Sequence, residues 1–362
     1  DGKRVSKVSA PMAAAGVGGP KISHSGIWSA CDSFTVDGKT QWVYAMREDV
    51  SILDHELKVL GKIDVTRVAD EQSPPHCVST SMHENFALAV GAGRHLFLFP
   101  SIHPLPEVYK LASAIECEEA VSSVAITKGF LIAASYNRVF SWRLTIDIKT
   151  GKHKAQILWA ARLNIPVEAM RVSPDARHVA VVHYISPEII HEEKVPEVPA
   201  VTIWDLTEQI QNNKAPPHSA LIHPGPVLSV QWLPPAHDST SSVEESAILT
   251  TCVDGDVRLW RMLVSPNFIP SLPKGSRLRR VAPQWFPAVE LEGDDREAKG
   301  GGRYIGASLI PGPRPSGGES RVLWLVTVQA GGSLWLWRAS SPLTWPRRQV
   351  VFDKVCRMDP KP

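Results

Sequence analysis

A strand–turn–strand unit recurs along most of this chain and limits its possible folds more than any other feature. Each unit has an apolar run, a tight turn carrying Gly, Asn or Asp, and a second run that ends in a bulky apolar residue. Short strands separated by such turn residues predict β-hairpins. Only 206–211 looks tolerant of a helix. The clearest copies read ALAVGAGRHLFLF, FLIAASYNRVFSW, AILTTCVDGDVRLW and LWLVTVQAGGSLWLW.

The bulky residues that close these hairpins set the period of the repeat. They are Leu53, Phe99, Trp142, Trp204, Trp260 and Trp337. The first two intervals match the roughly 40–45 residues of a four-stranded propeller blade. The later intervals are longer because they hold insertions rich in Pro, Gly, Ser or charge, which is typical of surface loops. An apolar run also precedes and follows each hairpin, so each hairpin is expected to be the inner pair of a four-stranded sheet.

These units predict an all-β fold, a β-propeller with six recognisable blades. A seventh blade, from the N-terminal residues or from flanking sequence, stays open. The chain begins at Asp1 without a Met or a signal peptide, which favours a fragment or a processed product. We expect 1–27 to be a linker or partial blade and 28–362 to be the propeller, with blades near 28–70, 76–117, 120–164, 166–222, 226–292 and 303–355.

The fifth unit resembles the WD40 repeat. It reads HPGPVLSVQW, then an insertion, then AILTTCVDGDVRLW, with His223 before the first strand, a turn Asp254 and a closing Trp260. The resemblance implies a side-chain hydrogen-bond network of His223, Thr250 or Thr251, Asp254 and Trp260 that holds the blade together. A buried Asp needs partners, and His and Trp offer N–H donors. The fourth unit ends in IWDL, where Trp204 and Asp205 form the WD dipeptide.

A narrower resemblance covers residues 223–260. Its His-Pro, Val and Trp, its inserted loop and its LTTC strand ending in RLW are similar to one blade of the DmX-like (rabconnectin) family. That family implies a large scaffold that regulates the assembly of the vacuolar proton pump.

Composition and motifs argue against several functional classes. The formal net charge is only +2, from 39 Lys and Arg against 37 Asp and Glu, so the charge does not favour nucleic acid as a partner. No apolar run approaches the roughly 20 residues of a membrane span. The sequence lacks G-x-S-x-G, H-E-x-x-H and phosphate-loop motifs, and its histidines are scattered. We therefore expect no catalytic residues, no cofactor and no metal. The odd number of cysteines, five, without a C-x-x-C pair favours a reducing compartment.

Two segments are candidates for partner binding. The insertion 185–199 alternates apolar and acidic residues, and the candidates there are Ile189, Ile190, Glu192 and Glu193. A basic loop carries Lys274 and the further candidates Arg277, Arg279 and Arg280, which could contact an acidic partner or phosphate. The prediction is a non-catalytic interaction scaffold that binds other proteins in a multi-subunit complex. It would be cytoplasmic, or peripheral to a membrane through its partners. The alternatives are a nucleic-acid-associated propeller and a propeller with a ligand in its central channel.

Overall fold

The computed structural model describes part of the chain, and every structural statement below refers to that part. It comprises residues 6–7, 30–36, 39–46, 49–65, 67, 73–81, 87–99, 111–127, 129–146, 153–174, 177–185, 198–206, 218–233, 247–263, 284–291, 303–311, 323–339 and 351–359. Two compact units divide the chain. Unit 1 contains Asp1–Val172, Val181–Tyr184 and Leu206–Pro216, and unit 2 contains Ser173–Ala180, Ile185–Asp205 and Pro217–Pro362.

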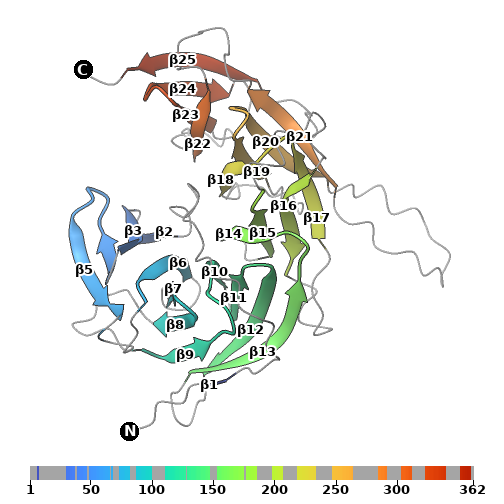
Figure 1. Cartoon of the computed structure of the whole chain (residues 1–362). Helices are drawn as coiled ribbons and strands as arrows, with labels where there is room; N and C mark the ends of the chain where they lie inside the picture. The colour runs from blue at the N-terminus through green and yellow to red at the C-terminus, as the bar shows by residue number, and fades with distance from the viewer. Residues whose placement is uncertain are drawn as a thin grey trace, which may run out of the picture. The chain divides into compact units, whose positions relative to one another are not determined.

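Within the described residues, 25 β-strands form six sheets, which we call blades 1 to 6 in chain order (Figure 1). Blade 1 holds β2 (Cys31–Val36), β3 (Lys39–Met46), β4 (Asp49–Leu53) and β5 (Val59–Asp64). Blade 2 holds β6 (Pro75–Ser81), β7 (Ala87–Ala92), β8 (His95–Phe99) and β9 (Ser113–Glu116), with β1 (Ser6–Lys7) added in parallel to β9. Blade 3 holds β10 (Ser123–Thr127), β11 (Phe130–Ser135), β12 (Arg138–Ile146) and β13 (His153–Arg162).

The other three blades repeat this order. Blade 4 holds β14 (Val167–Val172), β15 (His178–His183), β16 (Val198–Asp205) and β17 (His218–His223). Blade 5 holds β18 (Val227–Trp232), β19 (Ala247–Cys252), β20 (Val257–Leu263) and β21 (Gln284–Leu291). Blade 6 holds β22 (Tyr304–Pro311), β23 (Leu323–Gln329), β24 (Leu334–Ala339) and β25 (Phe352–Met358).

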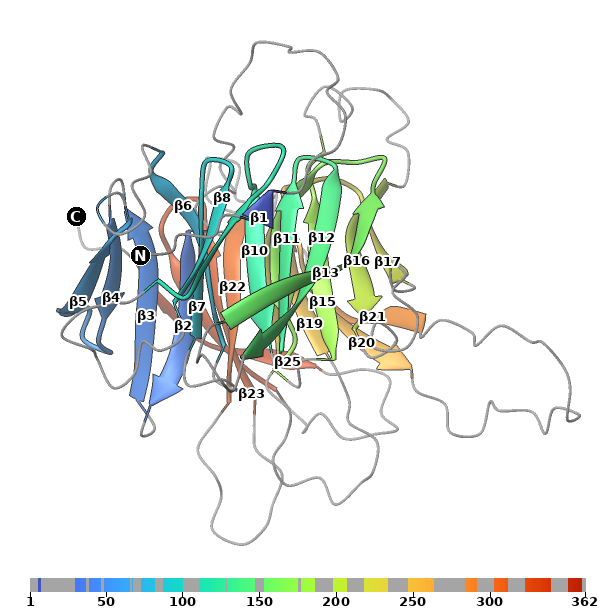
Figure 2. The ribbon, with the colours of Figure 1, turned by 90° about the horizontal axis from the view of Figure 1, so that it is seen from below.

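Apart from β1, strands that follow one another within a sheet are neighbours, and each hairpin noted in the sequence forms the second and third strands of its blade. Figure 2 shows this arrangement for β11 and β12 of blade 3. The closing residue lies in the third strand, and in four blades a β-bulge separates it from the residue before it. The bulges lie at Ile52/Leu53, Ser141/Trp142, Leu259/Trp260 and Leu336/Trp337. The predicted all-β fold and its six blades are therefore confirmed.

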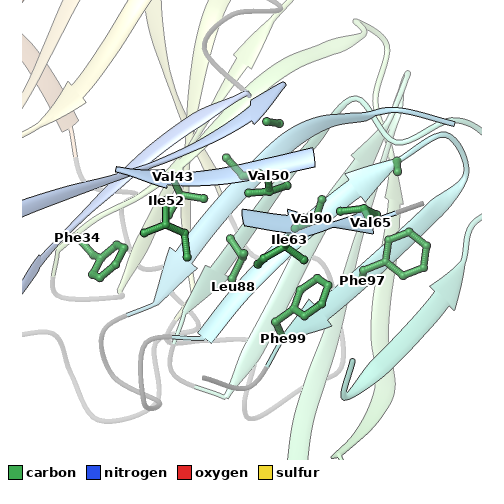
Figure 3. Close-up of a cluster of buried hydrophobic side chains, with 13 residues drawn as sticks. Phe34, Val43, Val50, Ile52, Ile63, Val65, Leu88, Val90, Phe97 and Phe99 are labelled. Atoms are coloured by element: carbon green, nitrogen blue, oxygen red, sulfur yellow. The ribbon is translucent and has the colours of Figure 1, made fainter. Parts of the chain in front are cut away.

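The hydrophobic core lies between successive blades. In unit 1, Val43 and Ile52 of blade 1 pack in one cluster with Leu88, Val90 and Phe99 of blade 2 (Figure 3). Alternate strand residues point to opposite faces of a sheet, so each middle strand supplies one set of side chains to the preceding blade and another to the next. A second cluster joins blades 2 and 3, and in unit 2 a third joins blades 5 and 6.

Candidate partner-binding surface

Three of the residues that the WD40 resemblance singles out meet in the interior of unit 2. His223 ends β17, Thr250 lies in β19 and Trp260 in β20, and all three side chains are buried. Trp260 Nε1 donates a hydrogen bond to Thr250 Oγ1 at 2.9 Å, and His223 Nε2 lies 2.9 Å from the same oxygen. The two ring centroids are 5.1 Å apart. Of the two threonines left open by the sequence, Thr250 is the one that contacts both rings, and Thr251 instead accepts a bond from Ser229.

The protonation of His223 follows from its surroundings. Burial lowers the pKa of His223 to about 4, so the ring is neutral near pH 7. Its Nδ1 lies 3.2 Å from the Leu221 carbonyl oxygen, which can only accept, so Nδ1 carries the proton. Nε2 is then an acceptor, and the Thr250 hydroxyl donates a hydrogen bond to it. Each polar atom of this trio has a partner, and the arrangement suits a structural tie between strands.

Asp254 has a different partner from the one expected. Its Oδ2 accepts a bond from Arg258 Nη2 at 2.9 Å, and its Oδ1 accepts the backbone N–H of Asp256 at 2.9 Å. Arg258 also donates to Asp256 Oδ2 at 2.8 Å. The aspartate therefore orders the β19–β20 turn and neutralises an arginine. No direct bond to His223 or Trp260 is needed for its charge to be satisfied.

In the fourth blade, Trp204 is buried in β16, and its Nε1 donates to Thr202 Oγ1 at 2.8 Å. Asp205 follows it as the last, half-buried residue of that strand. A further pair escaped the sequence-based prediction, since Trp337 Nε1 of blade 6 donates to Thr327 Oγ1 at 2.9 Å. The separation of ten residues is the same as between Thr250 and Trp260. This shared Thr–Trp spacing could have revealed the Thr327–Trp337 pair from the sequence.

The predicted partner-binding residues lie outside the described part of the chain. They are Ile189, Ile190, Glu192, Glu193, Arg277, Arg279 and Arg280. These candidates therefore stay predictions.

A different surface emerges at the turns of the middle hairpins. The turn of blade 2 begins with Gly93 and that of blade 3 with Tyr136, and each carbonyl accepts the backbone N–H that enters the next blade, from Val121 at 2.8 Å and from Val167 at 2.7 Å. Both turn residues have positive φ, 55° for Gly93 and 49° for Tyr136. A two-residue turn with positive φ at its first position favours glycine there. Blade 3 places a bulky tyrosine at that position, 63% exposed.

A second exposed tyrosine is tied to the same segment. Tyr184, 39% exposed, donates its backbone N–H to the Pro166 carbonyl at 2.8 Å, and the next residue, Val167, bonds to Tyr136. We call Tyr136 and Tyr184 the tyrosine surface. Tyr184 directly precedes the insertion 185–199. Sequence pattern alone missed this surface, although SYNR was the hairpin turn that carried an aromatic residue.

The described residues contain no group of three or more His, Cys, Asp or Glu side chains placed to hold a metal ion. No helix in the described part of the chain is long and apolar enough to cross a membrane. The five cysteines are present as free thiols.

Comparison with solved structures identifies the architecture. Hsv2 from Kluyveromyces lactis matches over 91% of this chain and 85% of its own, with a TM-score of 0.51 and 10% sequence identity. The chain has a β-propeller fold. The β-propeller domain of Cps50 (Swd1) from Myceliophteria thermophila is also similar, with a TM-score of 0.49, 12% identity and coverage of 91% of this chain and 89% of that one.

At such low identity these likenesses describe the fold alone. No protein-family model matches the chain, and no curated protein matches it. The DmX-like resemblance of 223–260 is not confirmed by these comparisons and stays a prediction.

Proposed function

We propose that this propeller is a non-catalytic protein-interaction scaffold within a multi-subunit assembly, and that the tyrosine surface contacts a partner. The observation that carries the proposal is Tyr136, a 63% exposed aromatic side chain at a turn position with φ of 49°. A left-handed conformation costs a non-glycine residue about 1 kcal/mol. Exposure leaves little packing to offset that cost, and strained residues cluster at functional positions.

Exposed tyrosines suit a binding role because their rings bury a large area with only two rotatable bonds. Tyr and Trp are accordingly enriched among the residues that dominate interface energies. Tyr184 supplies a second ring next to the same backbone segment, and the insertion with Ile189, Ile190, Glu192 and Glu193 begins just after it. The insertion is a separate candidate for partner contact, predicted from its sequence.

The sequence-based predictions of where the protein acts and in which complex are part of this proposal. The scaffold is proposed to act in the cytoplasm or at a membrane surface reached through its partners. The resemblance of 223–260 makes a proton-pump assembly complex the named candidate. Recovery of proton-pump subunits with the chain would support that assignment.

The replacement Tyr136→Gly tests the binding role, because glycine relieves the turn strain while it removes the ring. We expect the free energy of unfolding in urea to stay unchanged or rise by about 1 kcal/mol. We expect recovery of the stoichiometric partner in affinity capture with quantitative mass spectrometry to fall at least about tenfold.

Ile222→Ala is the matched control, because Ile222 is a 41% exposed apolar residue on the outer strand β17. It should leave capture unchanged. A Tyr136→Gly protein that captures the same partner at wild-type yield would contradict the proposal. A large loss of stability in the Tyr136→Gly protein would also contradict it, because the tyrosine would then be needed for folding.

A further inference from the structure

Blade 2 has a fifth strand, whereas each of the other five sheets of the described residues has four. The added strand, β1, pairs in parallel with β9, which is the last of the blade's own four strands (Figure 1). Both strands belong to unit 1, so their pairing does not involve the other unit. A segment that is distant in the sequence therefore occupies the outer edge of β9.

The edge that receives β1 is held in place by the blade itself. Ile115 of β9 is 3% exposed and packs in the cluster that joins blades 2 and 3. At one end of β9 the Ala112 N–H donates to the Leu98 carbonyl at 2.8 Å. At the other end the Cys117 N–H donates to the Arg94 carbonyl at 2.8 Å. The last strand of a sheet presents backbone N–H and C=O groups that can pair with one more strand, so β9 is a preformed site for it.

The two paired segments carry opposite charges. Residues 1–7 contain one acidic residue, Asp1, and three basic residues, which are Lys3, Arg4 and Lys7. Residues 113–119, which include β9, contain no basic residue and three acidic ones, which are Glu116, Glu118 and Glu119. In the parallel register Lys7 lies opposite Glu116. Opposite charges on neighbouring strands stabilise their pairing and like charges oppose it, so this edge favours a basic strand.

Arginines of the same unit leave carboxylate oxygens at this edge available to a further cation. Arg94 Nη2 donates to Glu116 Oε1 at 2.9 Å, and Arg138 Nη1 donates to Glu118 Oε2. A carboxylate accepts hydrogen bonds on both of its oxygens. The Glu116 side chain is 26% exposed and Glu119 is exposed, so solvent and a basic strand can reach them.

The contact of β1 is short compared with the segment that connects it to the rest of the blades. It comprises two residue pairs, Ser6 with Ile115 and Lys7 with Glu116. Residues 8–30 connect β1 to β2, and the entropic cost of closing a loop grows with its length. Parallel pairing is also slightly less stable per residue than antiparallel pairing. Such a strand can leave and rejoin the blade while β9 stays folded.

We propose that the outer edge of β9 is a binding site for a basic extended segment, that residues 1–7 of the same chain are its tethered ligand, and that this ligand exchanges on and off the blade. Backbone pairing attaches the ligand, and the glutamates select a basic one. While β1 is bound, it covers an edge that could otherwise pair with another chain. The site contains neither Tyr136 nor Tyr184, so it does not depend on the tyrosine surface.

Hydrogen–deuterium exchange of the purified 362-residue chain tests the pairing. The double replacement of Ser6→Pro and Lys7→Pro removes both backbone N–H groups of β1 and should release it. If β1 is bound at least half of the time, the β9 amides that face it should exchange at least about twofold faster in this variant than in the wild-type chain. The amides of β5, the last strand of blade 1, are the control and should not change. Unchanged exchange at β9 would overturn the proposal.

A fluorescent peptide with the sequence of residues 1–9, DGKRVSKVS, tests the ligand. In fluorescence anisotropy at low salt it should bind the double-proline variant at least about twofold more tightly than the wild-type chain, in which β1 competes with it. A peptide with Lys3→Glu, Arg4→Glu and Lys7→Glu should bind neither protein. The proposal would be overturned if the basic peptide did not bind the variant, or if both peptides bound it equally.

A matched pair of substitutions tests the selection by charge. In the double-proline background, Glu116→Gln should weaken binding of the basic peptide by about two- to fivefold. Glu56→Gln should leave it unchanged, because Glu56 is also ion-paired, with Lys58, but lies between β4 and β5 of blade 1. Equal effects of the two replacements would contradict the assignment of Glu116.

Sedimentation velocity distinguishes a tethered ligand from one supplied by a second copy. We expect the wild-type chain and the double-proline variant to have the same, monomeric sedimentation coefficient. A wild-type dimer that the double-proline replacement dissociates would assign the bound segment to a second copy and overturn the tethered arrangement.

Discussion

At the scale of single residues, Thr250 is the most exacting position of the network, because one hydroxyl serves two buried rings. Thr250→Val keeps the shape of the side chain and removes that hydroxyl. His223 Nε2 and Trp260 Nε1 then lose their hydrogen bond to Thr250. Each buried polar group left unsatisfied costs about 1–3 kcal/mol, so we expect a loss of about 3 kcal/mol in the free energy of unfolding. Urea unfolding at pH 7, followed by tryptophan fluorescence and circular dichroism, measures it.

Thr327→Val in blade 6 is the matched comparison, because Thr327 Oγ1 receives a bond from Trp337 alone among the bonds described for it. We expect about half the loss seen for Thr250→Val. Equal losses for the two variants would show that the His223 contact adds nothing to stability.

At the scale of secondary-structure elements, the pairing of β6 and β7 depends on a residue without a side chain. A Cβ added at Gly91 would clash with Cys77 Sγ and lie 3.2 Å from Val121 Cγ1. Gly91→Ala should therefore force β6 and β7 apart or shift the thiol, at a cost of about 1–3 kcal/mol. Urea unfolding of the single variant gives the size of the effect.

The clash with sulfur can be separated from other effects by a double-mutant cycle. Cys77→Ala removes the nearest atom, so the cost of Gly91→Ala should shrink by at least about 1 kcal/mol in that background. Unchanged cost would mean that Val121 or the backbone, and not Cys77, limits the space at position 91.

The strands themselves were predictable from sequence because a period of two residues and the turn residues are local signals. The six sheets and their middle hairpins follow from those signals. The bulges beside Leu53, Trp142, Trp260 and Trp337 were not predictable, since a bulge changes register without a distinctive residue type.

Less of the candidate site than of the fold could be predicted from the sequence. The Thr–Trp spacing of ten residues recurs in blades 5 and 6 and could have been found. The exposure of Tyr136 could not, because whether a turn residue is covered depends on segments far away in the chain.

At the scale of the whole molecule, the packing between blades determines which thiols react. Burial raises the pKa of Cys77, Cys117 and Cys252 to about 12 in each case, whereas Cys356 is exposed on β25. Thiolate is the reactive form and appears as pH rises toward the pKa, so at pH 8 a pKa of 12 leaves about one thiolate in ten thousand. We expect Cys356 to be alkylated first and Cys77, Cys117 and Cys252 to resist.

Alkylation with iodoacetamide followed by peptide mass spectrometry measures each thiol separately. Burial also raises the pKa of the half-buried Cys31, which should react more slowly than Cys356. In denaturing urea all five should react at similar rates. Because Cys77 lies in unit 1 and Cys252 in unit 2, the urea dependence of their labelling reports the opening of each unit. If Cys77 or Cys252 reacted as fast as Cys356 without denaturant, the cores between blades could not be packed as described.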